Sequence, residues 1–131
     1  MEAKKLAGLE PASVFGYFEE ICAIPHGSRN TKAVSDYVVD FAKSHGLRYV
    51  QDDMNNVVVY APGTCGLEDH PTVILQGHLD MVCEKNADCP IDMTAQGLDV
   101  MCDDKFVFAK GTTLGGDDGI AIAMGLALLN D

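Results

Sequence analysis

A short aliphatic run at residues 72–76 constrains the fold more than any other feature of the chain. It reads Thr-Val-Ile-Leu-Gln and contains no charged residue. An unbroken run of β-branched and aliphatic residues is typical of a strand with both faces covered, as in the middle of an α/β sheet. The run therefore predicts a central strand, and the polar residues 62–71 before it predict a loop.

Two amphipathic helices are expected before this strand. In residues 11–24 the apolar side chains recur at helical spacing, with Pro11 suited to the first turn. Residues 31–45 show the same spacing, with Asn30 as a candidate N-cap and Gly46 where a left-handed residue would end the helix.

Short β-rich segments lie on both sides of the aliphatic run. Two hairpins are predicted, one from residues 47–51 and 56–61 and one from residues 100–102 and 106–108. The stretch 119–129 is apolar nearly all round, which predicts a buried helix. Helices alternating with strands around a buried strand indicate an α/β fold in which a mixed β-sheet is sandwiched by helices.

The charge balance excludes some classes of partner. Twenty Asp and Glu against nine Lys and Arg give a net charge of −11, which would repel nucleic acid and anionic lipid. No run is long enough for a membrane span and the start lacks a secretory signal, so a cytoplasmic protein is expected. The chain's five cysteines include no C-x-x-C pair, which favours reduced thiols.

The first polar cluster that could carry chemistry directly follows the predicted central strand. His78 and Asp80 lie two positions apart there, and the carboxyl ends of strands are where α/β sheets bind ligands. In an extended backbone both side chains point to the same side, so Asp80 could orient the imidazole or join it at a metal. The structural alternative is a pair of solvated loop residues.

The second cluster is a pair of adjacent carboxylates, Asp117 and Asp118, set among glycines at the start of the last predicted helix. One of them could simply cap that helix. A phosphate-binding loop is disfavoured, because no Lys-Ser or Lys-Thr follows the glycines and the carboxylates would repel a phosphate.

Taken together, one histidine and several carboxylates at strand-end and helix-start positions suit zinc, manganese or cobalt. This set favours a metal hydrolase. His78, Asp80 and Asp117 do not complete two metal shells, however, and nothing in the sequence places a general-base glutamate beside them.

The two clusters resemble the motifs of a known group of enzymes. The run V-I-L-Q-G-H-L-D-M-V followed by G-T-T-L-G-G-D-D-G-I is similar to the di-zinc aminopeptidase and carboxypeptidase clan, and within it to the aminoacyl-histidine dipeptidase family. Ile24-Pro25-His26 and Lys85-Asn86 match that family as well. The resemblance covers essentially the whole chain.

The resemblance implies a role for each matching residue. His78 would ligate one zinc and Asp117 would bridge two, while Asp80 would act in catalysis by orienting the imidazole. The bond between Asp117 and Asp118 would be cis. The family usually has Ala and Asn where this chain has Gly116 and Asp118, so Asp118 adds a charge near the metals.

The same resemblance implies the reaction. Two zinc ions per complete site, with manganese or cobalt as alternatives, would activate a water for hydrolysis of a dipeptide with a C-terminal histidine, and a downstream Glu-Glu pair would move its proton.

The resemblance also implies an incomplete domain. Residues 1–131 would be the N-terminal part of the catalytic domain, without the C-terminal part and the lid domain that mediates homodimer formation. Alone, the chain should be inactive, and it should expose apolar edges, including the last helix. The alternatives are another dipeptidase, a tripeptidase or a deacylase of the clan, or a non-catalytic binding module.

Overall fold

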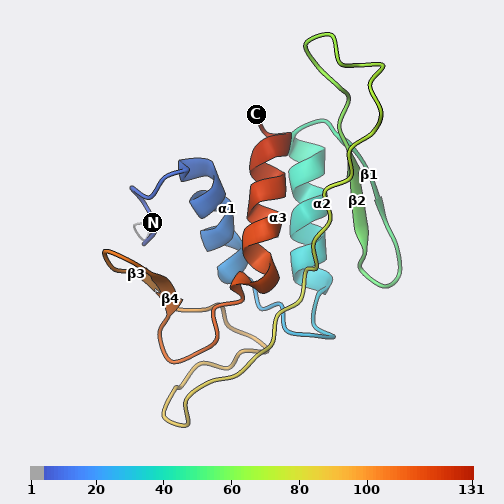
Figure 1. Cartoon of the computed structure of the whole chain (residues 1–131). Coiled ribbons are helices and arrows are strands. Elements are labelled where there is room, and N and C mark those ends of the chain that lie inside the picture. The colour runs from blue at the N-terminus through green and yellow to red at the C-terminus, as the bar shows by residue number, and fades with distance from the viewer. Residues whose placement is uncertain (1–4) are drawn as a thin grey trace.

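Three helices form the centre of the molecule, a computed structural model that describes residues 5–131 (Figure 1). They are α1 (Ala12–Cys22), α2 (Lys32–Ser44) and α3 (Gly116–Leu129). Helix α3 packs along α1, and the buried face of α2 joins the same hydrophobic cluster. The α/β class is confirmed, because two small antiparallel sheets accompany the helices.

The first two helices follow the predicted apolar pattern. Phe18 and Ile21 of α1 are buried, as are Val34 and Val38 of α2. Gly46 has φ +65°, which confirms the left-handed residue after α2. The predicted N-cap is wrong: Thr31 takes that position, and the Asn30 side chain instead donates to the carbonyl oxygen of Thr94.

Both predicted hairpins are present. Strands β1 (Arg48–Gln51) and β2 (Val57–Tyr60) pair antiparallel and pack against α2. Strands β3 (Val100–Cys102) and β4 (Val107–Ala109) form the second antiparallel pair. The stretch between β2 and β3 is long and, apart from isolated bridges, irregular.

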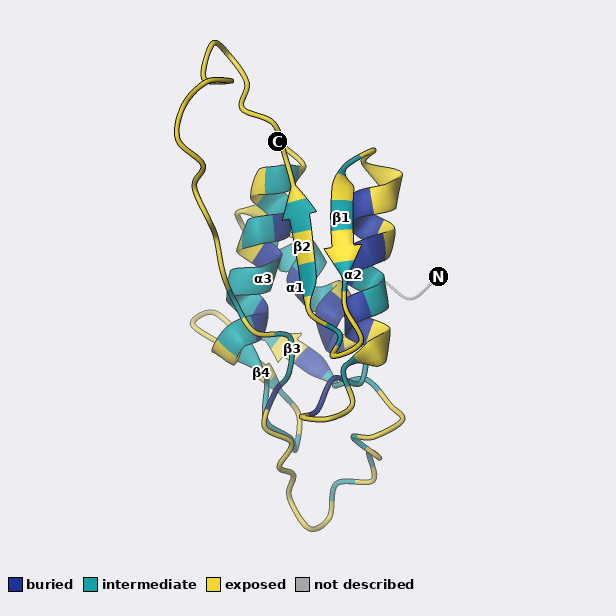
Figure 2. Cartoon of the chain, turned by 90° about the vertical axis from the view of Figure 1, so that its right-hand side faces the viewer, coloured by how far each residue is buried: buried dark blue, intermediate teal, exposed yellow. Residues whose placement is uncertain are grey.

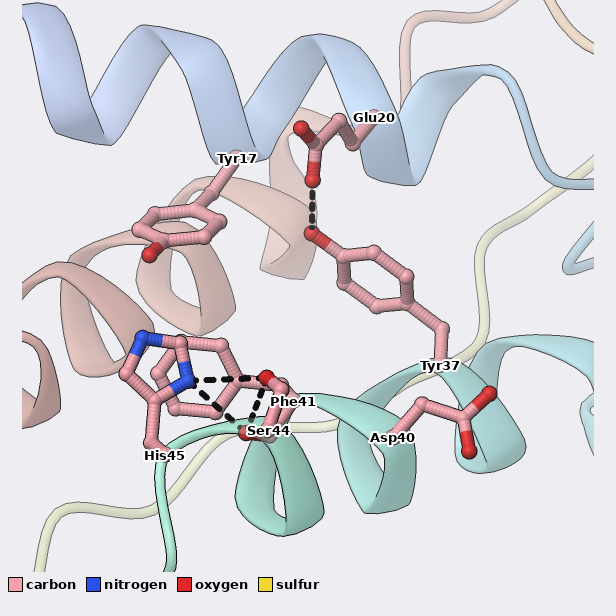
Figure 3. Close-up of a pocket in the computed structure, with 7 residues that line it drawn as sticks. All are labelled: Tyr17, Glu20, Tyr37, Asp40, Phe41, Ser44 and His45. Atoms are coloured by element: carbon pink, nitrogen blue, oxygen red, sulfur yellow. Dashed lines mark hydrogen bonds between the residues drawn. The ribbon is translucent and has the colours of Figure 1, made fainter.

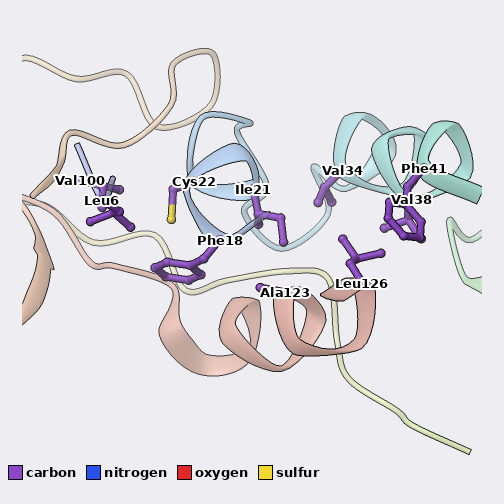
Figure 4. Close-up of a cluster of buried hydrophobic side chains, with 10 residues drawn as sticks. All are labelled: Leu6, Phe18, Ile21, Cys22, Val34, Val38, Phe41, Val100, Ala123 and Leu126. Carbon is purple, nitrogen blue, oxygen red and sulfur yellow. The ribbon is translucent and has the colours of Figure 1, made fainter. Parts of the chain in front are cut away.

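The core is formed by side chains that are far apart in the sequence (Figure 4). Leu126 of α3 lies among Ile21, Val34 and Val38 of the first two helices, and Ala123 lies near Phe18. Val100 of β3 also belongs to this cluster. The core thus joins α3 to the first two helices and to β3.

The predicted central strand is wrong for this chain. Residues 72–76 are extended but form no strand, and Val73 and Ile74 are 81% and 84% exposed. Figure 2 shows this segment as a long exposed loop beside the helices. A strand needs hydrogen-bonded neighbours, and no segment among residues 5–131 pairs with it. A mixed sheet is therefore absent from the described residues.

The last helix is buried on one face only, so the prediction of a buried helix holds for that face. Gly119, Ala123 and Leu126 face the core, whereas Met124 and Leu128 are 51% and 63% exposed. The expectation that this helix exposes an apolar edge is confirmed. All five cysteines are free thiols. None of the helices in the described part of the chain has the length and apolar character needed to span a bilayer.

Candidate active site

His78 lies two residues beyond the exposed aliphatic run, and its ring is held from two sides. The Nδ1 atom is 3.1 Å from Asp80 Oδ1 and 3.0 Å from the Asp80 carbonyl oxygen. Both atoms are acceptors, so Nδ1 carries the proton in these contacts. Asp80 therefore orients the imidazole as expected from an extended backbone.

Asp117 reaches the same ring from the start of α3. Its Oδ1 atom is 2.9 Å from His78 Nε2. Gly115, two residues before it, has φ +72°, the Asp117–Asp118 bond is cis, and both aspartates have non-helical backbone angles. The cis bond is the one that the resemblance implies. The two motifs that the sequence singled out thus meet at one imidazole.

Asp118 has a different role from its neighbour. Its Oδ2 atom accepts a hydrogen bond of 3.2 Å from the backbone N–H of His78. A Cβ at Gly77 would lie 2.8 Å from that oxygen, so a larger residue there would displace the Asp118 carboxylate. Neither carboxylate caps α3, so the capping interpretation is wrong. Asp118 instead ties the backbone before His78 to the helix.

Sequence reasoning missed a fifth side chain, Ser28. Ser28 lies in the loop that follows α1, and its hydroxyl donates a hydrogen bond of 2.5 Å to Asp80 Oδ2. The available signal was its position two residues after the Ile24-Pro25-His26 motif, which indicates no role.

The imidazole of His78 and the carboxylates of Asp80 and Asp117 stabilise one another's charged forms. The hydrogen bond from His78 Nε2 to Asp117 is the largest influence on His78 and raises the pKa of the imidazole, and the contacts with Asp80 add to the effect. The hydrogen bond from Ser28 is the largest influence on Asp80 and lowers the pKa of that carboxyl. Both ring nitrogens face carboxylates, so a cation at this position is favoured, whether the cation is a proton or a metal ion.

The donor atoms fit part of a metal site. With the proton on Nδ1, His78 can offer Nε2 as a ligand beside a carboxylate oxygen of Asp117, which is the donor set that zinc prefers. Both side chains are accessible, with 49% and 94% exposed. Within residues 5–131, however, no group of three or more His, Cys, Asp or Glu side chains could hold a metal ion.

A separate hollow lies between α1 and α2 (Figure 3). The Tyr37 hydroxyl donates to Glu20 at 2.6 Å across it, and burial raises the pKa of Tyr37. The rings of Tyr17 and Phe41 meet edge to face with centroids 5.5 Å apart. These contacts join the two helices, and none of the predicted site residues lines this hollow.

Comparisons with known proteins agree with the motifs. No family model matches the chain. Over 127 residues, 97% of its length, the chain is 39% identical to the cytosol non-specific dipeptidase of Escherichia coli (strain K12), and it spans 26% of that protein.

A solved structure gives the same result. The chain matches the crystal structure of aminoacylhistidine dipeptidase from Vibrio alginolyticus with a TM-score of 0.92 and 40% identity, over 96% of this chain and 26% of that one. The resemblance that the paired motifs indicated is thereby confirmed: this chain is homologous to one segment, about a quarter in length, of these dipeptidases.

Proposed function

We propose that residues 1–131 are the N-terminal part of the catalytic domain of a zinc-dependent dipeptidase that acts on dipeptides with a C-terminal histidine. The observation that carries the proposal is the contact between His78 Nε2 and Asp117 Oδ1, at 2.9 Å, with Nδ1 held by Asp80. The names of the two relatives support the hydrolysis of dipeptides.

In this proposal His78 and Asp117 would hold the metal through Nε2 and a carboxylate oxygen. When bound, zinc supplies Lewis acidity that activates water and polarises the scissile carbonyl, and manganese or cobalt could replace it. Asp80 acts by keeping the proton on Nδ1, so that Nε2 stays available as a ligand. Asp118 keeps the backbone before His78 against α3.

The remaining ligands and the general base are proposed to come from the rest of the protein. Two donors are too few for a closed zinc shell, so the 131-residue chain alone should bind zinc weakly and hydrolyse nothing. The other part of the protein would also cover the exposed aliphatic run and add the lid domain of a homodimer. The relative's name supports a cytosolic location, and the excess negative charge argues against nucleic-acid and membrane partners.

A broader dipeptidase is the second candidate, because the curated relative is named as a non-specific dipeptidase. The two candidates share the metal site and differ in the pocket that accepts the C-terminal residue. A tripeptidase or deacylase of the same clan is a further alternative.

The test starts from the coding sequence beyond the Asp131 codon. If it continues, the purified parent protein is assayed with zinc or manganese on an Xaa-His dipeptide, a dipeptide without histidine, a tripeptide and an N-acyl amino acid. We expect hydrolysis of the Xaa-His dipeptide, loss of it in His78→Ala and Asp117→Ala, and retention in the control His70→Ala, which changes an exposed loop residue.

Equal rates on both dipeptides would favour the broader enzyme. Failure to cleave any substrate would overturn the peptidase proposal. A stop codon directly after Asp131 would favour a non-catalytic binding module.

A further inference from the structure

Ser28 is the one side chain of the loop between α1 and α2 that has a hydrogen bond to the site formed by His78, Asp80, Asp117 and Asp118. Its Oγ atom is 2.5 Å from Asp80 Oδ2. An ionised carboxylate only accepts hydrogen bonds, so the hydroxyl must be the donor. The contact joins residues that are 52 positions apart in the chain.

The backbone of this loop is fixed independently of the serine hydroxyl. Gly27 forms a parallel bridge with Met81, the Met81 N–H donates to the His26 carbonyl oxygen at 3.0 Å, and the Ser28 N–H donates to the Met81 carbonyl oxygen at 3.3 Å. A Cβ at Gly27 would lie 2.7 Å from Cys83 Sγ, which shows how closely the two segments approach. The loop therefore delivers the Ser28 side chain to a defined place.

The two oxygens of Asp80 are divided between two partners. Oδ2 accepts from Ser28, while Oδ1 lies 3.1 Å from His78 Nδ1. The terminal torsion of an aspartate is intrinsically broad, so a single partner would leave the carboxylate plane free to turn. A second donor on the other oxygen fixes that plane and, with it, the direction in which the imidazole is held.

We propose that Ser28 is a positioning residue: its hydroxyl fixes the Asp80 carboxylate, which accepts a hydrogen bond from His78 Nδ1 and so holds the ring with Nε2 directed at Asp117. Its importance for metal binding rests on the proposed function, but the coupling itself is a property of the metal-free chain. Partners of this kind around a metal-binding histidine set the tautomer and orientation of its ring.

The test uses the 131-residue chain without metal. The ¹H and ¹⁵N signals of the four histidine rings report the hydrogen bond made by each ring N–H, and His78→Gln assigns the His78 signals. Ser28→Thr and Ser28→Val have nearly the same shape and differ in the hydroxyl alone, so their comparison isolates the hydrogen bond even if branching at Cβ disturbs the loop.

We expect the His78 Nδ1–H signal to show the hydrogen bond to Asp80 in the parent chain and in Ser28→Thr, and to lose it in Ser28→Val. Ser44→Ala is the matched control, because Ser44 Oγ lies 3.1 Å from His45 Nδ1 and its removal should change the His45 signal alone. The same His78 spectrum in Ser28→Thr and Ser28→Val would overturn the proposal. Activity is not measured, so failure of the dipeptidase proposal would leave this result intact.

Discussion

The helical core and the extended segment before His78 contain the same kind of aliphatic residue in opposite environments. Ile21 and Val34 in the helices are 2% and 1% exposed, whereas Val73 and Ile74 are 81% and 84% exposed. The difference shows that an aliphatic pattern predicts a preference for burial but does not say where the covering surface comes from. For the helices that surface lies within this chain, and for residues 72–76 it does not lie within the described residues.

The largest effect on stability is expected from changing a core isoleucine to alanine, and the same substitution in residues 72–76 provides the comparison. Ile21→Ala removes packed side-chain atoms and should lower the free energy of unfolding by about 2–5 kcal/mol. Ile74→Ala changes an exposed side chain and should stay within about 0.5 kcal/mol of the parent chain. Urea denaturation of both variants checks this, with the smaller change Ile21→Val as a milder probe of the core. Similar losses at the two positions would show that residues 72–76 are packed.

The second comparison is the reactivity of a buried thiol, Cys22, with that of an exposed thiol, Cys65. Burial, with a smaller contribution from Glu19, raises the pKa of the Cys22 thiol from 9.0 to about 12. The thiolate is the reactive form, so a shift of this size lowers its fraction at mildly alkaline pH by about a thousandfold. Cys65 is exposed in the connecting loop.

Variants that retain either Cys22 or Cys65, with the other cysteines changed to serine, can be alkylated and followed by mass spectrometry. We expect rapid labelling of Cys65, and labelling of Cys22 only under unfolding conditions. Labelling of Cys22 in the folded chain as fast as that of Cys65 would contradict the closed core.

Substitutions at two glycines test whether the end of the stretch between β2 and β3 packs against the core. A Cβ at Gly97 would lie 2.5 Å from the carbonyl oxygen of Ala23, and Leu98 N–H donates to Cys22 O at 2.9 Å. Gly97→Ala should therefore destabilise the chain by about 1–3 kcal/mol. Gly125→Ala meets open space in α3 and should stabilise it by about 0.5–1 kcal/mol. Thermal unfolding compares the two variants. If Gly97→Ala leaves the stability unchanged, residues 97–98 do not pack against the end of α1.

The smallest effect concerns the turn of the β1–β2 hairpin. Asp52 accepts hydrogen bonds from the backbone of Met54 and Asn56 and from the Asn56 side chain, and the last of these is the main cause of its lowered pKa. A lowered pKa stabilises the folded chain above the ordinary carboxyl pKa of 3.8, and this contribution is lost as the pH falls through the folded-state value.

Asp52→Asn should therefore reduce stability at neutral pH and make it less sensitive to acid in that range. Denaturation at a series of pH values tests the sign. If the stability of the variant depends on pH as that of the parent chain does, the hydrogen bonds of ionised Asp52 do not contribute to stability.

The parts of the fold that depend on neighbours in sequence could be predicted. Helical spacing located α1 and α2, and the polar residues Asp52 to Asn55 located the turn between β1 and β2. The contact of His78 with Asp80 also followed from local geometry, because alternate residues of an extended chain share a side.

What depends on distant partners could not be predicted from pattern. The aliphatic run indicated a strand, but strand formation needs a neighbour that no local pattern supplies. Asn30 has the chemistry of an N-cap and instead binds Thr94, which is 64 positions away. Ser28 was missed because a single serine in a loop carries no signal until the fold brings it to Asp80. The meeting of His78 with Asp117 was indicated by the metal-ligand chemistry that the two motifs share and by the resemblance, and not by any local spacing.

A zinc titration of the 131-residue chain, followed through the side-chain signals of its four histidines, tests the central claim most directly. The account predicts weak binding that perturbs His78 first, leaves His26, His45 and His70 nearly unchanged, and becomes weaker still in Asp117→Asn. Zinc binding that perturbs the other histidines first, or that is unaffected by Asp117→Asn, would contradict the assignment of His78 and Asp117 as one half of a metal site.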